Sequence, residues 1–120
     1  MRFTKSHEYI KPGKDHYTLG ITNYAEEALG DIVNLNHVIQ KGDMIENEQI
    51  VSEIDSIKAV SEINSPIAGE VIEVNNEVEG NPSLVNKSPL EKGWLLKIKS
   101  SDDINHLMEE DDYNKYIKDC

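Results

Sequence analysis

The chain has few aromatic residues and a single cysteine. Of its 120 residues one is Trp, one is Phe and five are Tyr, so the core must be built mainly from Ile, Leu and Val. The cysteine, Cys120, is the last residue; this excludes an internal disulfide and fits a reducing compartment. A frayed terminal residue without a role is an equally simple interpretation of Cys120.

Long apolar runs and positive charge are also scarce. No stretch is long or apolar enough to span a bilayer, and the N-terminal MRFTKSHEYI lacks the apolar core of a signal peptide. With 12 basic against 23 acidic residues, the net charge of -11 repels phosphate backbones and anionic membrane surfaces. We therefore expect neither nucleic-acid nor membrane partners, whereas basic surfaces of other proteins remain compatible.

The usual signatures of catalysis and metal binding are absent from the sequence. It has no C-x-x-C, H-E-x-x-H, P-loop, G-x-G-x-x-G or G-x-S-x-G motif. The four histidines are scattered and none forms a close pair with another metal-ligating residue: His7, His16, His37 and His106. The sequence therefore predicts no metal site and no active site of its own.

The pattern of turns and β-branched residues predicts many short strands. A hairpin is expected around the turn KPGKD, between HEYI and HYTLGIT. A short helix over residues 22–31 is expected to be capped by Thr22 or Asn23, to approach a capping box with Glu26, and to stop at Gly30. Further expected elements are strands at 31–39, 71–74 and 94–100, one helical turn at 83–86, and a terminal helix that begins at residue 101 or 102. Together, these expected elements predict a small β-sandwich or barrel with helical additions.

One segment, SEIDSIKAVSEINSP at residues 52–66, contains a single lysine, Lys58. Large apolar residues in and just before this segment recur every third position, which fits neither strand nor helix: Val51, Ile54, Ile57, Val60 and Ile63. All five are β-branched, which favours a strand–turn–strand arrangement with Lys58 near the tip. A lone lysine is ordinarily a surface charge, yet lysine has no turn-forming role, and an exposed lysine at a rigid tip suits covalent attachment.

Several blocks across the chain are similar to the family of glycine cleavage system H proteins, which are lipoyl carriers. They are SHEY at 6–9, GITNYAEEALGDIV at 20–33, SIKAVSEINSPIAGEVIEVN at 56–75, NPSLVN at 81–86 and GWLLKIK at 93–99. The resemblance implies a mainly β fold: a flattened lipoyl/biotinyl-carrier sandwich of two antiparallel sheets, with a short helix in the N-terminal half and a C-terminal helix. It implies one domain over 1–120, with a core of about 1–100 and a helical extension of about 101–118.

The same resemblance implies a carrier rather than an enzyme, with lipoate in amide linkage on Lys58. Implied partners are a pyridoxal-phosphate-dependent glycine decarboxylase, a tetrahydrofolate-dependent aminomethyltransferase, dihydrolipoyl dehydrogenase, and a lipoate ligase or octanoyl/lipoyl transferase. The carrier would take the aminomethyl group from the first to the second and be reoxidised by the third. Since Met1 lies only a few residues before SHEY, a bacterial cytoplasm is expected, or a mitochondrial matrix if a transit peptide has been removed.

Individual site roles also follow from the resemblance. Ser6, Glu8 and Glu62 would line a cleft that shelters the loaded arm, because a carboxylate stabilises a cationic amine. Asp55, where the family usually has Glu, and Gly42 would help the lipoylating enzyme to recognise the hairpin. The family's S-H-E-W aromatic position is Tyr9 in this chain.

Three alternatives remain open at this point. An H-like relay protein that donates lipoate to other enzymes would share Lys58 but need not keep the cleft residues. A biotin carrier on the same fold is marked by methionines beside the lysine, where this chain has Ile57 and Ala59. An unmodified β-sandwich binding module would gain no lipoyl mass even in the presence of ligase and lipoate.

Overall fold

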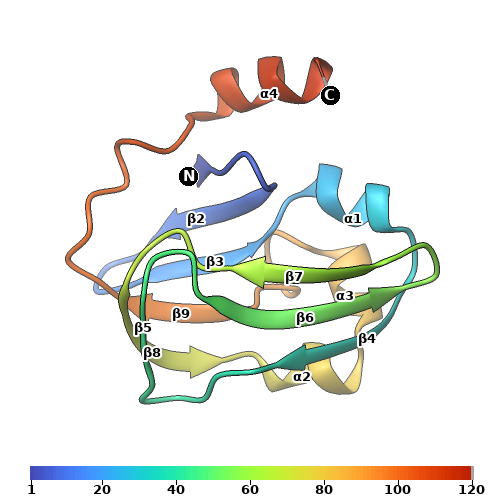
Figure 1. Ribbon diagram of the computed structural model, residues 1–120, viewed down its shortest axis with the longest axis horizontal. Coiled ribbons are helices and arrows are strands. Elements are labelled where there is room, and N and C mark those ends of the chain that lie inside the picture. Colours follow the sequence, from blue (N-terminus) through green and yellow to red (C-terminus); the bar gives the residue numbers. More distant parts are fainter. Residues whose placement is uncertain (120) are drawn as a thin grey trace.

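Strands predominate in the computed structural model, which describes residues 1–119 and in which they form two antiparallel sheets (Figure 1). The larger sheet has the order β1-β2-β3-β9-β8-β5, and the smaller one the order β4-β6-β7. The strands are β1 (Arg2–Phe3), β2 (Glu8–Pro12), β3 (Tyr17–Ile21), β4 (Ile32–His37), β5 (Met44–Ile45), β6 (Ile50–Ser56), β7 (Val60–Asn64), β8 (Gly69–Val74) and β9 (Leu96–Lys99). The helices are α1 (Asn23–Leu29), α2 (Asn76–Gly80), α3 (Ser83–Lys87) and α4 (Glu110–Lys118). The prediction for Cys120 lies outside the described residues.

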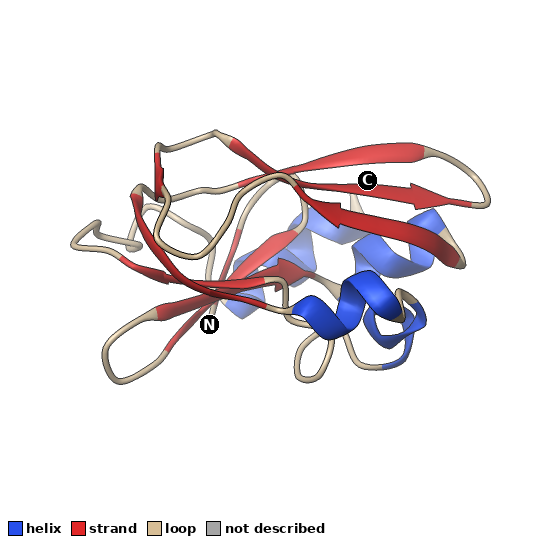
Figure 2. Cartoon of the chain, turned by 90° about the horizontal axis from the view of Figure 1, so that it is seen from below, coloured by secondary structure: helices blue, strands red, loops and turns tan. Residues whose placement is uncertain are grey.

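The main core lies between the two sheets, which Figure 2 shows as separate layers. Its fully buried side chains are almost all aliphatic, among them Ile10 and Leu19 from the larger sheet and Val51 and Ile54 from the smaller. This arrangement confirms the predicted mainly β sandwich of two antiparallel sheets. Within residues 1–119, no helix has the length and apolar character needed to cross a bilayer.

The predicted hairpin and first helix are both present. β2 pairs with β3, and the Gly13 amide donates to the His16 carbonyl at 2.7 Å across the turn. α1 begins after Thr22, whose side-chain oxygen accepts from the Ala25 amide at 3.2 Å. Glu26 does not complete a capping box. Its carboxylate instead accepts from the Asn86 side-chain amide at 3.0 Å, which ties α1 to α3.

The hairpin β6–β7 explains the period of three in residues 51–63. Val51, Ile54 and Ile63 point into the core, whereas Ile57 and Val60 are 66% and 73% exposed at the tip. A register shift between Ile50 and Ser52 adds one residue to β6, and the chain then reverses direction at 57–59. The period is therefore produced by a bulge and a turn, and by no single regular element.

A second, smaller cluster covers part of the outer face of the larger sheet. Phe3, Tyr9 and Tyr113 are its buried members, and the rings of Phe3 and Tyr113 stack at 4.5 Å. The Tyr9 hydroxyl donates to the Pro89 carbonyl at 2.9 Å, which satisfies the one polar atom of that ring. Through Tyr113, α4 packs on this face near the N-terminus (Figure 1).

The predicted start of the terminal helix at residue 101 or 102 is wrong, because α4 begins at Glu110. The segment before it makes contacts elsewhere that a helix cannot make. The Asp102 carboxylate accepts from the Ala68 amide at 2.8 Å, and Met108 exchanges two backbone hydrogen bonds with Phe3, at 2.8 and 2.9 Å. The apolar spacing of this segment is helical, but its apolar residues pack on both hydrophobic clusters.

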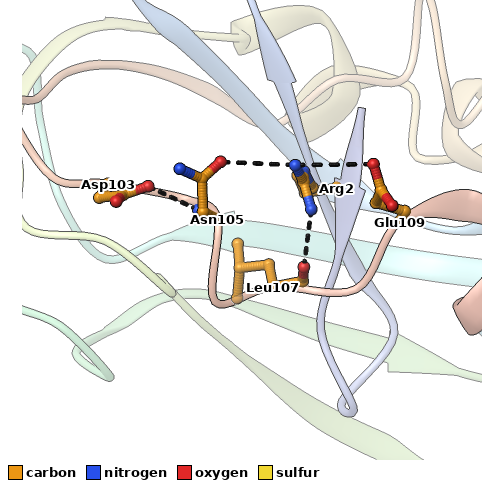
Figure 3. A network of polar contacts seen from close by, with 5 residues as sticks. All are labelled: Arg2, Asp103, Asn105, Leu107 and Glu109. Carbon is orange, nitrogen blue, oxygen red and sulfur yellow. Dashed lines mark hydrogen bonds and ion pairs between the residues drawn. The ribbon is translucent and has the colours of Figure 1, made fainter.

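Figure 3 shows how Arg2 holds the same segment against β1. Its guanidinium donates to the Leu107 carbonyl at 3.3 Å and to the Asn105 side-chain oxygen at 3.4 Å, and lies 3.7 Å from the Glu109 carboxylate. The backbone N–H of Asn105 in turn donates to the Asp103 carboxylate at 2.7 Å. The two ends of the chain are thus joined by side chains that sequence patterns do not pair.

Candidate functional site

The turn that presents Lys58 is organised by the side chain of Ser56. Its hydroxyl oxygen accepts from the amides of Lys58 and Ala59 at 3.2 and 3.1 Å, and the hydroxyl donates to the Ala59 carbonyl at 3.1 Å. The Ser56 amide also donates to the Ala59 carbonyl, at 2.8 Å. A Ser side chain that bonds to the amide two residues ahead replaces a backbone turn contact. The Ser56 side chain therefore closes this turn, and no glycine does so.

The tip is also fixed to the end of α1. The Ile57 amide donates to the Asp31 carbonyl at 3.1 Å. Gly30, which ends α1 with a φ of 74°, lies directly beneath the tip, because a Cβ there would come within 3.3 Å of the Ile57 side chain and 3.4 Å of the Lys58 Cε. The Ser56 side chain and the Ile57–Asp31 hydrogen bond therefore hold the backbone of the tip, while Lys58 itself is exposed.

The surface beside Lys58 is apolar at the tip and acidic along the strands. Ile57 and Val60, together with Val33 on β4, are exposed large apolar side chains. Asp55 and Glu62 flank this apolar group on β6 and β7. Among residues 1–119, no group of three or more His, Cys, Asp or Glu is placed to hold a metal ion.

Glu8 is the carboxylate that the fold buries most completely, at 4% exposure. The Thr4 hydroxyl donates to it at 2.8 Å, and the Asn64 amide at the end of β7 donates to it as well. Burial raises the pKa of Glu8 above its ordinary value, the nearby Glu48 adds to that rise, and the two hydrogen bonds partly oppose it. Burial makes the ionised form of Glu8 costly, and a cation that approaches the carboxylate offsets this cost.

Ser6 lies in the same N-terminal loop and lines a hollow of about 330 Å³ beside Glu48 and Pro66. Glu62 lies two residues before Asn64 on β7, with its side chain exposed. The structure thus brings Ser6 and Glu8 to the end of β7, and places Glu62 between that end and Lys58.

Asp55 and Gly42 lie in different parts of the molecule. Asp55 pairs with Val60 across the hairpin, and its carboxylate accepts from the Asn34 side-chain amide at 3.4 Å. Gly42 has a φ of 95° in the turn between β4 and β5, at the opposite end of the molecule from the hairpin tip (Figure 1). The structure therefore brings Asp55 to Lys58 and leaves Gly42 distant.

Two residues that shape this site were missed by the sequence predictions. Ser56 was given no role, although a Ser two residues before the exposed position is a known turn signal. Gly30 was predicted only as a helix stop, and its contact beneath Ile57 and Lys58 depends on tertiary packing. Only the first of the two could have been inferred from local sequence.

Comparison with known proteins gives one consistent family. The family model described as glycine cleavage H-protein matches residues 1–120. The chain is 40% identical over 119 residues to the glycine cleavage system H protein of Staphylococcus carnosus (strain TM300), covering 98% of this chain and 94% of the relative. It is 37% identical over 121 residues to the mitochondrial glycine cleavage system H protein 2 of Arabidopsis thaliana, covering 99% and 77%.

A solved structure agrees with these sequence matches. The crystal structure of a glycine cleavage system H protein from Mycobacterium marinum superimposes with a TM-score of 0.87 at 29% identity, and covers 97% of this chain and 94% of that one. The similarity therefore extends over nearly the whole length and is not confined to the lysine hairpin.

Proposed function

Because the chain belongs to the family of glycine cleavage H-proteins, the lipoyl aminomethyl carriers of the glycine cleavage system, we propose that Lys58 is its lipoate attachment point. The protein is a carrier within that system and not an enzyme. Family membership implies the system's decarboxylase, aminomethyltransferase and dihydrolipoyl dehydrogenase as partners. We infer that the first uses pyridoxal phosphate and the second tetrahydrofolate, and that a lipoate ligase or an octanoyl/lipoyl transferase modifies the lysine.

The observation that supports Lys58 is its position at a fixed turn. An amide bond to lipoate needs an amine that a modifying enzyme can reach, and Lys58 is exposed at the outermost part of the hairpin. The bonds from Ser56 and the Ile57–Asp31 contact hold the backbone, so a partner meets one geometry. When attached, lipoate supplies a dithiolane that exchanges electrons and accepts the one-carbon unit.

The length of such an arm fits the position of Glu62. Twelve bonds join the Lys58 Cα to the nearer sulfur of lipoate, a reach of about 15 Å from ordinary bond lengths. A strand rises about 3.3 Å per residue, so Glu62 lies about 13 Å from Lys58 along the hairpin. An arm folded back along β7 therefore reaches Glu62. Asn64, beside which Glu8 is buried, lies about 20 Å from Lys58 by the same rise, and the aminomethyl group on the sulfur adds two bonds, about 2.5 Å, in that direction.

We propose that Ser6, Glu8 and Glu62 provide the polar groups that face the loaded amine. An ammonium near Glu8 favours its ionised form and lowers a pKa that burial raises, so the carboxylate contributes attraction where water is partly excluded. Glu62 remains exposed and contributes a weaker, screened attraction. Ser6 supplies a hydroxyl at the mouth of the adjacent hollow.

We also propose that the lipoylating enzyme contacts Asp55, three residues before Lys58. Its carboxylate lies on the outer face of the hairpin, across from Val60. The shorter side chain keeps the charge of the family's usual Glu and withdraws it by one methylene. Gly42 would act from a distance, through the turn that its positive φ permits.

A purified glycine decarboxylase with the lipoylated protein tests this proposal. We expect glycine-dependent exchange of labelled carbon dioxide with the parent protein and none with Lys58→Arg, which keeps the charge but cannot form the lipoyl amide. Correct folding of Lys58→Arg is checked by its melting curve.

The same assay separates a relay protein from a glycine cleavage carrier. A relay protein would be lipoylated on Lys58 and pass lipoate to other enzymes, yet give no exchange with the decarboxylase. Lipoylated parent protein without glycine-dependent exchange would contradict the proposed role.

A further inference from the structure

A basic hollow on the outer face of the larger sheet is unexplained by the lysine arm. It has a volume of about 540 Å³ and is lined by residues of β2, β3 and β9 and of the loop before β9. We call it the outer-face hollow. Its walls include the side chains of Leu90 and Trp94, and its cations are Lys11, Lys92 and Lys97.

The cations follow from the register of the sheet. Lys11 lies opposite Thr18, and Thr18 lies opposite Lys97, so these positions form one row across three neighbouring strands. Lys92 comes from the loop that closes the hollow, and Glu91 is the one carboxylate that residues 1–119 place in the wall. A chain with 12 basic and 23 acidic residues thus places three lysines around one hollow.

These lysines differ in how far their charge is already compensated. Lys97 lies 3.7 Å from the Glu73 carboxylate and 4.9 Å from the centre of the Trp94 ring, so it positions the indole as well as bearing charge. Lys11 and Lys92 are exposed, and neither forms an ion pair within residues 1–119. Two lysines are therefore available to a negatively charged ligand beside a half-buried Trp.

We propose that the outer-face hollow is a docking site for an acidic segment of another protein that has an aliphatic side chain as its anchor. Trp is typical of residues that dominate binding at interfaces, and Leu90 beside Trp94 offers the apolar surface that such an anchor buries. The lysines at the rim pair with carboxylates at short range, where their local charge outweighs the screened net charge of the chain. A second copy of the chain is a poor occupant, because each copy has a net charge of -11.

The outer-face hollow lies far from Lys58, so a partner docked there would not cover the lysine. The turn between β2 and β3, which forms one wall, lies at the opposite end of the molecule from the tip of the β6–β7 hairpin (Figure 1). A partner bound there would leave Lys58 accessible, and docking would raise the local concentration of the arm at the partner's active site. This inference goes beyond the proposed function and does not depend on lipoylation.

Trp94 allows the test to be made by fluorescence, because it is the one Trp of the chain. The probe is the peptide Asp-Glu-Leu-Glu-Asp with blocked ends, and Ser-Ser-Leu-Ser-Ser is the uncharged control. We expect a saturable change of Trp94 emission with the acidic peptide at concentrations up to about 1 mM, and none with the control peptide. The change should weaken in 1 M salt, where the screening length falls to about 3 Å.

Charge-reversal variants of the lysines test whether the peptide binds in the outer-face hollow. The double variant Lys11→Glu, Lys92→Glu should weaken peptide binding about tenfold, whereas Lys41→Glu, an exposed lysine outside the hollow, should leave it unchanged. Unmodified protein is used throughout, so failure here is distinct from failure of the lipoyl assay. Melting curves confirm that the variants fold.

Several results would overturn the proposal. They are an unchanged Trp94 emission with the acidic peptide, equal binding of the uncharged peptide, or equal weakening by Lys41→Glu. Tighter binding of ATP than of the peptide, in competition with it, would assign the hollow to a small anion instead. Self-association that the double variant abolishes would assign it to a second copy.

Discussion

Replacing Ser56 by Ala should loosen the tip that presents Lys58 without unfolding the hairpin. The variant loses the two hydrogen bonds that the hydroxyl oxygen accepts and the one that it donates. All three lie at the surface, so the freed groups are hydrated and each loss costs only about 0.5 kcal/mol. The sum is about 1–1.5 kcal/mol, and the backbone bond from Ser56 to Ala59 remains.

This free energy can be measured in two ways. For 120 residues, 1 kcal/mol corresponds to about 4 °C in melting temperature, so the midpoint should fall by about 4–6 °C. The amides of Lys58 and Ala59 each lose one acceptor, so their hydrogen exchange should speed up about two- to fivefold. Lipoylation by a purified ligase should slow by no more than about tenfold, the factor that corresponds to 1.4 kcal/mol.

Two controls make the test specific. Ser101→Ala removes an exposed hydroxyl that lies outside any hairpin and should change neither quantity. Ser56→Thr keeps the hydroxyl and should restore the slow exchange of both amides. The reasoning would be refuted if Ser56→Ala left the two amides and the melting temperature unchanged, because the turn would then not depend on the side chain.

Three further predictions concern other parts of the chain. Lys58→Arg should abolish lipoylation and shift the melting temperature by less than about 2 °C, because an exposed turn side chain contributes little packing; a loss of cooperative unfolding would contradict this. Glu8→Gln should gain stability relative to the parent as pH rises above 4.5, the ordinary carboxyl pKa. The pKa of Glu8 is raised in the folded protein, so its ionisation lowers the folding stability of the parent and not that of the variant. Denaturant titrations at several pH values check the sign, and a pH-independent difference between the two proteins would count against it. Arg2→Ala should speed hydrogen exchange in residues 105–109 and leave the β6–β7 hairpin unaffected, and equal acceleration in both regions would show that Arg2 acts globally.

Local sequence was sufficient where one short-range signal determines the structure. The turn after β2 and the Thr22 cap of α1 each depend on residues within a few positions, and both were predicted correctly. The hairpin around Lys58 was predicted as well, although its period of three could not distinguish strand from helix. Its β-branched residues indicated strands, and the bulge in β6 that produced the period is set by tertiary pairing.

Local sequence failed where distant contacts compete with local preference. Residues 101–109 have helical apolar spacing, but Asp102 and Met108 bond to segments far away in the chain. α2 was missed because this five-residue helix depends on burial of Val78 and on the Asn75 side chain, which donates to the distant carbonyls of Lys92 and Trp94. The burial of Glu8 beside Asn64 likewise joins residues 56 positions apart in the chain, so its raised pKa could not be inferred from the SHEY block.

The central claim is that Lys58 bears lipoate, and intact mass measurement of the protein from its native cells tests it most directly. We predict a mass increase equal to one lipoyl group, which peptide fragmentation assigns to Lys58. Unmodified protein, in cells where other lipoyl proteins are modified, would contradict the account, as would a lipoyl group on any other lysine.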